Sequence, residues 1–296
     1  MSNFAELRRR LYAELPEYAR TLILSPRYRN HQDPFRQDFA QFPDDPRMHS
    51  LQWHQWGVVS HTVKVGEQFE TTLPVKLQEW FGPALGRDRL GLGRESIEGV
   101  CKWELLLSSV PTHDWGKFTL RGLAKGCGDK PKFRFFGHEA ESGALVRERS
   151  LWFEEQGVSR DQLEYIARCS ELHFELGKLR DMARNKGGYN LEWVGSDDFL
   201  RASAKIGLKH PGFEREIGLF FLADSWGKTD LMDSREFVSD RAIADLKGDL
   251  KRQVKDRGLE PNLIECALQL PINTAVGRRF LEWVVDQTTG FGLAEG

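Results

Sequence analysis

Cysteine is scarce in this sequence, and the few cysteines lie far apart. The 296 residues include four cysteines and no CxxC pair: Cys101, Cys127, Cys169 and Cys266. This spacing argues against a cysteine-ligated zinc site and favours free thiols in a reducing compartment.

Long apolar runs are missing too. No stretch approaches the roughly 20 apolar residues that cross a bilayer. Residues 1–14 mix Arg8, Arg9 and Arg10 with glutamates, so they lack the apolar centre of a secretory signal. We therefore expect a cytoplasmic protein without a membrane partner.

Neither sign of charge is in large excess. The chain has 42 Lys and Arg against 44 Asp and Glu, for a formal net charge of -2. This balance excludes a global attraction to nucleic acid or to an anionic membrane, although local basic patches remain possible. With 40% hydrophobic residues, the chain is long enough to bury a substantial core.

The alternating pattern of β-strands is absent as well, and no internal repeat is visible. Apolar residues recur instead at helical spacing, as in Phe4, Leu7, Leu11 and Leu15. We expect an all-α fold with a loop over 82–93 and helices over residues 4–22 (interrupted at Pro16), 53–70, 73–81, 96–109, 138–156 and 160–179.

One short stretch carries several groups of chemical interest. The apolar run that ends at Val110 leads into His113 and Asp114, with Lys117 three residues later. An imidazole nitrogen and a carboxylate are two different metal ligands, and the second carboxylate oxygen can bridge to a second metal. Lys117 falls one helical turn beyond Asp114, where it can hold a phosphate as a point charge.

Matching ligands occur on other predicted helices. His61, His138 and His173 each lie on a separate helix or at its start, and a helical bundle can bring such residues to one interior point. Asp224 follows the apolar run 219–223, where a carboxylate is costly unless it is paired or bound to a metal. The alternatives are satisfied core histidines and an ion pair between Asp224 and Lys228.

The order of these residues resembles a known pattern. His61, His113–Asp114, His138, His173 and Asp224 resemble the H…HD…H…H…D series of HD-domain metal-dependent phosphohydrolases, and residues 113–117 (HDWGK) resemble the family's His-Asp-x-Gly-Lys. Residues 137–144 (GHEAESGA) resemble its Gly-His-Glu segment, and residues 54–62 resemble the HD region of bacterial CCA-adding enzymes, without the nucleotidyltransferase head.

The resemblance implies a fold and a domain organisation. We expect an HD-domain-like helical bundle with an insertion around 82–95, between the first two metal-ligand helices. A helical and irregular extension would cover 1–50, the catalytic core 51–230 and a C-terminal helical extension 231–296.

The resemblance also implies roles for individual residues. One divalent transition metal (Mn, Fe, Co, Ni or Zn) would be held by His61, His113, Asp114 and Asp224. A second would be held by His138 and His173, with Asp114 bridging. Asp114 and Lys117 would be catalytic. From the residues themselves, Lys117 and Arg121 would contact the substrate, while His54 would either contact it or have a capping or packing role. Glu139 would either orient a histidine or be a solvated carboxylate at a helix start.

The expected function is hydrolysis of a phosphomonoester or phosphodiester in a small phosphorylated substrate, either a nucleotide or an RNA end. Two alternatives are a non-catalytic module with a structural metal, which binds a nucleotide or another partner, and a helical scaffold that binds no metal. Two basic clusters could line a phosphate pocket or be solvated surface: Arg121, Lys125, Lys130, Lys132 and Arg134, and Lys178, Arg180, Arg184 and Lys186. Four tryptophans near the candidate ligands could stack on a base or pack in the core: Trp53, Trp56, Trp115 and Trp226.

Overall fold

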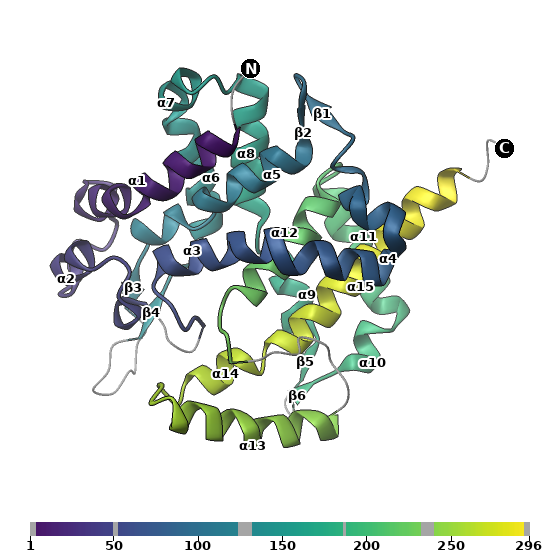
Figure 1. Ribbon diagram of the computed structural model, residues 1–296. Coiled ribbons are helices and arrows are strands. Elements are labelled where there is room, and N and C mark those ends of the chain that lie inside the picture. Colours follow the sequence, from purple (N-terminus) through teal and green to yellow (C-terminus); the bar gives the residue numbers. More distant parts are fainter. Residues whose placement is uncertain (1–3, 50–52, 124–131, 186–187, 232–239, 293–296) are drawn as a thin grey trace.

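The computed structural model describes residues 4–49, 53–123, 132–185, 188–231 and 240–292 (Figure 1). Helices dominate it: α1 Phe4–Leu24, α2 Arg36–Gln41, α3 Val58–Glu67, α4 Leu73–Arg87, α5 Lys102–Ser109, α6 His138–Glu148, α7 Ser150–Glu155, α8 Arg160–Leu172, α9 Gly177–Met182, α10 Leu191–Val194, α11 Asp197–Lys209, α12 Glu214–Trp226, α13 Asp240–Asp256, α14 Leu263–Ala267 and α15 Leu270–Gly292. The prediction of an all-α fold is confirmed at this level.

Three small antiparallel hairpins were not predicted from the sequence. They pair β1 (Ser96–Ile97) with β2 (Val100–Cys101), β3 (Gly122–Leu123) with β4 (Phe133–Arg134), and β5 (Arg184–Asn185) with β6 (Gly188–Tyr189). Each strand is two residues long, too short for any alternation of apolar and polar residues to appear.

Helix α12 lies at the centre of the molecule, between two hydrophobic cores (Figure 1). Every residue from Glu216 to Trp226 is buried. Phe220 joins a core built mainly from α1, α3, α5 and α8, whereas Phe221 joins a second core with α9, α11 and α15. A helix that is apolar on all sides must be covered on all sides, which explains the continuous apolar run in its sequence.

Helices α12 and α15 approach each other closely because each has a glycine opposite a leucine of the other. A Cβ at Gly218 would lie 2.5 Å from Leu281, and a Cβ at Gly277 would lie 2.6 Å from Leu222. The two helices are therefore interlocked at these two points, and neither glycine can accept a side chain without displacing its neighbour.

Several predicted boundaries were wrong. Helix α1 continues through Pro16, because Leu11, Leu15 and Ala19 hold both halves of the helix against the core. The predicted loop over 82–93 is helical as far as Arg87, with a kink where Gly82 adopts a φ of 81°. The predicted helices over 96–109 and 138–156 also differ: the first begins only at α5, after a hairpin, and the second divides into α6 and α7.

The core crosses the expected domain boundaries. Seven side chains of α1 share a core with residues of α5 and α12, and α15 packs along α12. The boundaries near 50 and 230 therefore stay predictions. No helix within the described residues is both long enough and apolar enough to span a membrane.

Candidate metal centre

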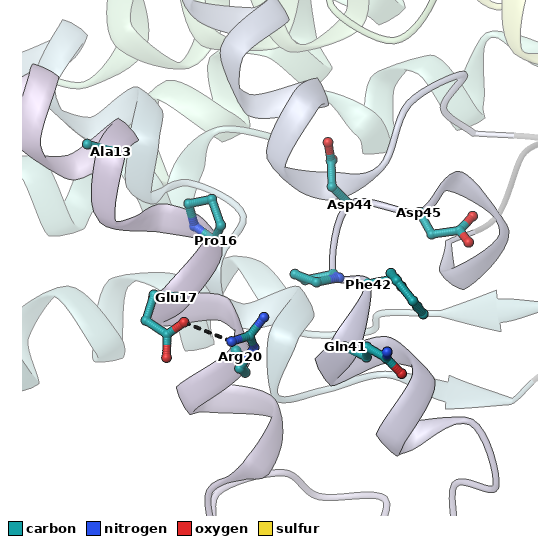
Figure 2. Close-up of a pocket in the computed structure, with 9 residues that line it drawn as sticks. Ala13, Pro16, Glu17, Arg20, Gln41, Phe42, Asp44 and Asp45 are labelled. Carbon is teal, nitrogen blue, oxygen red and sulfur yellow. Dashed lines mark hydrogen bonds and ion pairs between the residues drawn. The ribbon is translucent and has the colours of Figure 1, made fainter.

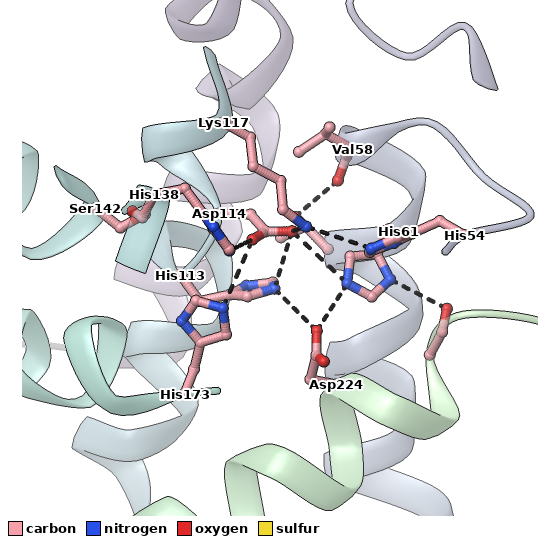
Figure 3. Close-up of polar contacts among 12 residues, drawn as sticks. His54, Val58, His61, His113, Asp114, Lys117, His138, Ser142, His173 and Asp224 are labelled. Carbon is pink, nitrogen blue, oxygen red and sulfur yellow. Dashed lines mark hydrogen bonds and ion pairs between the residues drawn. The ribbon is translucent and has the colours of Figure 1, made fainter. Parts of the chain in front are cut away.

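Six candidate ligands from five separate parts of the chain meet in the interior (Figure 3). His61 belongs to α3 and Asp224 to α12, while His138 is the first residue of α6. His173 follows the last residue of α8, and the His113–Asp114 pair lies between two short turns of 3-10 helix, at Val110–Thr112 and Trp115–Phe118.

The four histidines are all held by the same ring nitrogen. Each Nδ1 lies at hydrogen-bond distance from a backbone carbonyl oxygen: His61 to Gly227 at 3.2 Å, His113 to Val110 at 2.7 Å, His138 to Phe135 at 2.8 Å and His173 to Ser170 at 2.7 Å. A carbonyl oxygen can only accept, so Nδ1 carries the proton. In a neutral ring this leaves the Nε2 lone pair free, as in metal-binding histidines.

The four Nε2 atoms converge on the two oxygens of Asp114 (Figure 3). They divide into two pairs: His61 at 3.7 Å and His113 at 3.4 Å from Oδ2, and His138 at 3.3 Å and His173 at 3.7 Å from Oδ1. Two triads that share Asp114 are therefore compact enough to hold metal ions: His61–His113–Asp114 and Asp114–His138–His173.

These separations suit a metal. Ligand atoms about 2.1 Å from a metal, at angles of about 90–120°, lie roughly 3.0–3.6 Å apart. Nε2 of His113 and Oδ1 of Asp114 are buried and have no hydrogen-bond partner among the described residues. Such orphaned atoms are costly in a protein interior, and a bound cation would satisfy both.

Asp224 completes the first group of ligands. Its Oδ1 lies 3.0 Å from Nε2 of His61 and 3.8 Å from Nε2 of His113. Its Oδ2 lies 2.9 Å from the Lys228 ammonium, so the ion pair considered as an alternative is also present. The two roles are compatible because they use different oxygens.

Burial and neighbouring lysines favour neutral histidines and ionised carboxylates, which are the forms that bind metals. Burial lowers the pKa of His61, and more strongly that of His173, so both rings stay neutral. Burial alone would raise the pKa of Asp114, but the Lys117 ammonium, 2.7 Å from its Oδ2, helps to hold that pKa well below its usual value. Burial alone would also raise the pKa of Asp224, but Lys228 together with the hydrogen bond to His61 holds that pKa well below its usual value.

Gly116 has a specific steric reason to be glycine. A Cβ at this position would lie 2.2 Å from the carbonyl oxygen of His138. The Gly116 backbone N–H donates to Ser142 Oγ at 2.9 Å, and that hydroxyl donates to the same His138 carbonyl at 2.8 Å. The glycine therefore lets the turn that follows Asp114 pack directly on the start of α6.

A pocket of about 660 Å³ reaches the metal-ligand cluster. His138, His173 and Asp224 line it together with Lys117 and His54. Of the two predicted basic clusters, Lys132, Arg134, Arg180 and Arg184 line the pocket, whereas Lys125, Lys130 and Lys186 lie outside the described residues. Pockets of this size accommodate small organic ligands.

Lys117 and His54 lie together at the inner end of this pocket. The ammonium of Lys117 is 3.3 Å from Nε2 of His54 (Figure 3). An ammonium only donates, so Nε2 of His54 accepts. Lys117 therefore lies beside the candidate ligand Asp114 and both residues line the pocket, while their contact with a phosphate stays a prediction.

Arg121, by contrast, is not part of the pocket lining. Its side chain is 1% exposed, and its guanidinium bonds to Asp33, to the Tyr28 hydroxyl and to the carbonyl oxygens of Phe35 and Met48. The rings of Phe39 and Phe133 lie 4.0 and 4.3 Å from it. These partners hold the guanidinium in a structural arrangement away from the pocket lining, and the predicted contact between Arg121 and a substrate stays a prediction.

Glu139 lies near the histidine that it was expected to orient, and the four tryptophans occupy different kinds of position. The Glu139 carboxylate lies 3.4 Å from Nδ1 of His138, but the Phe135 carbonyl is the closer partner of that nitrogen. Of the four tryptophans, Trp53 lines the pocket, Trp115 and Trp226 are core residues, and Trp56 donates to the Gly227 carbonyl.

Sequence reasoning missed His49 as a pocket residue. Its ring stacks on Phe135 at 4.6 Å and contacts His54 edge-on at 4.5 Å. Both of its nitrogens are buried and have no hydrogen-bond partner among the described residues. His49 lies in a proline-rich segment outside any predicted helix, so helical periodicity gave no signal for it.

A second hollow, of about 530 Å³, lies between α1 and the segment after α2 (Figure 2). Its charged groups already have partners: Arg20 pairs with Glu17, Asp45 with Arg47, and Asp44 accepts from Ser60. The described residues that line it include no histidine, so it offers no comparable set of metal ligands.

Comparisons with known proteins add no family assignment. No protein-family profile matches the chain, and a search of curated proteins finds no match.

Proposed function

We propose that this protein is a metal-dependent phosphohydrolase of the HD-domain type, which cleaves a phosphoester of a nucleotide or an RNA end. One observation carries the proposal. Four histidines, each held through Nδ1 by a carbonyl, direct Nε2 toward the two oxygens of one aspartate. The order of these ligands along the chain, and the short interval between Asp114 and Lys117, are those of the resemblance described above.

Residues of this chain would hold one or two divalent ions. His61, His113, Asp114 and Asp224 would hold the first, and Asp114, His138 and His173 the second. Imidazole and carboxylate ligands of this kind suit Mn, Fe, Co, Ni or Zn. When bound, such ions polarise the phosphoryl group and lower the pKa of a coordinated water.

The protein's own groups would bind and orient the phosphate. The Lys117 ammonium, 5% exposed and next to Asp114, supplies a positive charge where phosphoryl oxygens gain negative charge. His54 holds this ammonium through Nε2 at 3.3 Å. The enclosed position of both groups excludes bulk water and strengthens their interaction with an anion.

The open pocket favours catalysis over a purely structural metal. A structural site is closed by protein ligands, whereas a catalytic site keeps an approach for substrate. Here His138, His173 and Asp224 all border a pocket large enough for a nucleotide. On the same proposal, the insertion expected around 82–95 corresponds to the kinked end of α4 and the 3-10 turn at Arg89–Gly91.

Hydrolysis assays with metal analysis test this proposal. The protein is stripped with a chelator, reloaded with Mn, Fe, Co, Ni or Zn, and assayed on p-nitrophenyl phosphate, bis-p-nitrophenyl phosphate and a nucleotide panel. We expect metal-dependent turnover that Asp114→Asn abolishes, with circular dichroism unchanged. His31→Gln, which changes a histidine outside the cluster, is the matched control and should keep both metal and turnover.

The outcomes separate the alternatives. Bound metal without turnover on any substrate would favour a non-catalytic module with a structural ion. Absence of any bound metal after reloading would refute the metal centre itself and leave a helical scaffold.

A further inference from the structure

The pocket lining contains more cationic side chains than the two that pair with the candidate metal ligands. Six cationic residues line it: Lys117, Lys132, Arg134, Arg180, Arg184 and Lys228. Among the described residues, three carboxylates share the lining: Glu139, Asp181 and Asp224. A bound metal ion would add further positive charge, so a pocket of this composition favours a ligand with several negative charges.

Two of these cations are unusually buried and meet at one ring. Lys228 is 8% exposed and Arg180 is 6% exposed. The Lys228 ammonium lies 4.6 Å from the centre of the Phe174 ring, and the Arg180 guanidinium lies 5.2 Å from the same centre. Each cation has one carboxylate partner, Asp224 for Lys228 and Asp181 for Arg180, and an anion beside both cations would stabilise these buried charges further.

The local structure holds this pair of cations in place. Gly177 leaves room for the Phe174 ring, because a Cβ there would lie 2.5 Å from it. Arg180 donates from Nε and Nη2 to Asp181 at 3.0 and 2.7 Å. Lys228 is fixed through Asp224 and through its carbonyl oxygen, which accepts from the Gln55 backbone N–H at 2.8 Å.

This pair differs from Lys117 in its surroundings. Lys117 contacts Asp114 and His54, whereas Lys228 contacts Asp224 and Phe174. In Figure 3, Lys117 and Asp224 approach the cluster from opposite sides. The pocket thus offers a cation at each carboxylate of the centre, and one of the two has Arg180 as a neighbour.

We infer that Lys228 and Arg180 form a second anion subsite, so that the substrate carries at least two linked phosphates. One phosphate would lie at the metal centre with Lys117, and another would lie against Lys228 and Arg180. This inference rests on the proposed function for the first position, but the second position is testable without turnover. Two sources of linked phosphates fit this chemistry, a nucleoside di- or triphosphate and an oligonucleotide.

Calorimetry on the chelator-treated full chain tests the inference. The probes are inorganic phosphate, pyrophosphate and tripolyphosphate at fixed ionic strength. We expect the wild-type protein to bind pyrophosphate at least 10-fold more tightly than phosphate. Arg180→Gln and Lys228→Gln should each remove most of this preference, while Lys117→Gln should weaken phosphate and pyrophosphate alike.

Arg180→Gln is the cleaner of the two variants, because Lys228→Gln leaves the buried Asp224 carboxylate without its cation. Arg180→Gln leaves behind Asp181, whose side chain is 62% exposed, and the neutral amide of Gln269, so no buried charge is stranded. Lys178→Gln, on the same helix and 65% exposed, should behave like the wild type. Thermal melts check that every variant is folded.

The results also identify the source of the phosphates. Competition by a nucleoside triphosphate, but not by a short oligonucleotide, would assign a mononucleotide, and the reverse would assign a nucleic-acid end. Equal affinity of the wild type for phosphate and pyrophosphate would overturn the subsite, as would an unchanged preference in both Arg180→Gln and Lys228→Gln. Loss of hydrolysis alone would count against the proposed function and not against the subsite.

Discussion

Arg121→Met tests whether this arginine is a structural clamp or a substrate contact. The substitution keeps an apolar stem between Phe39 and Phe133 but leaves the Asp33 carboxylate, 1% exposed, without its guanidinium partner. Breaking a buried ion pair by removing one partner costs about 3–5 kcal/mol. We therefore expect the free energy of unfolding to fall by about that amount.

A double-mutant cycle supplies the decisive measurement. Urea unfolding, followed by tryptophan fluorescence, is measured for Arg121→Met, Asp33→Asn and the double variant. Because the second change removes the charge that the first leaves unpaired, the double variant should lose at least about 2 kcal/mol less than the sum of the two single losses. Arg20→Met, which breaks an exposed pair with Glu17 on α1, should cost less than about 1 kcal/mol.

The reasoning fails if Arg121→Met costs less than about 1 kcal/mol, or if the losses of Arg121→Met and Asp33→Asn simply add. A raised KM with unchanged stability would restore the substrate-binding role that the sequence predicted for Arg121.

Three further predictions concern the centre and its support. Asp114→Asn should lower the metal content at both triads and reduce turnover by about 100-fold or more, as read by elemental analysis and initial rates; retention of both ions would contradict the shared-ligand geometry. Gly116→Ala should cost about 1–3 kcal/mol in urea unfolding, because the added methyl displaces the His138 carbonyl, and should reduce metal binding; a neutral effect would contradict that contact. Arg215→Met should lower the urea midpoint at pH 7, and the difference from wild type should shrink as the pH falls from 4.5 toward 2. This sign follows because Arg215 helps to lower the pKa of Glu95 from 4.5 to about 2 in the folded state, so that stabilisation is present above 4.5 and lost as the carboxylate is protonated. A difference that persists at pH 2 would show that the ion pair is not its source.

The candidate centre could be predicted because some of its residues lie close together in the sequence and because another, Asp224, places a charge where burial is costly. The interval from Asp114 to Lys117 places both on one turn, and the structure gives an ion pair of 2.7 Å. Asp224 lies in an apolar run where a carboxylate needs a partner, and it has His61 and Lys228. The order of the histidines then supplied the rest of the set.

Features that depend on distant partners could not be predicted. Arg121 was grouped with the basic residues that follow it in the sequence and was expected to contact the substrate. Its guanidinium instead pairs with Asp33, 88 residues away in the sequence. The two-residue strands are too short to show an alternation of apolar and polar residues in the sequence. Helix α1 continues through Pro16 because the core supports it, and local propensity cannot reveal that support.

Because α12 and α15 pack closely at two glycines, the C-terminal part of the chain influences the candidate metal centre. Asp224 lies on α12, the helix that carries Gly218 and Leu222. The position of its carboxylate therefore depends on how closely Leu281 and Gly277 of α15 pack against α12. A methyl group added at Gly277 would shift α12 and, with it, one of the six candidate ligands. If the proposed ion is bound there, a substitution at Gly277 should therefore weaken metal binding before it unfolds the protein.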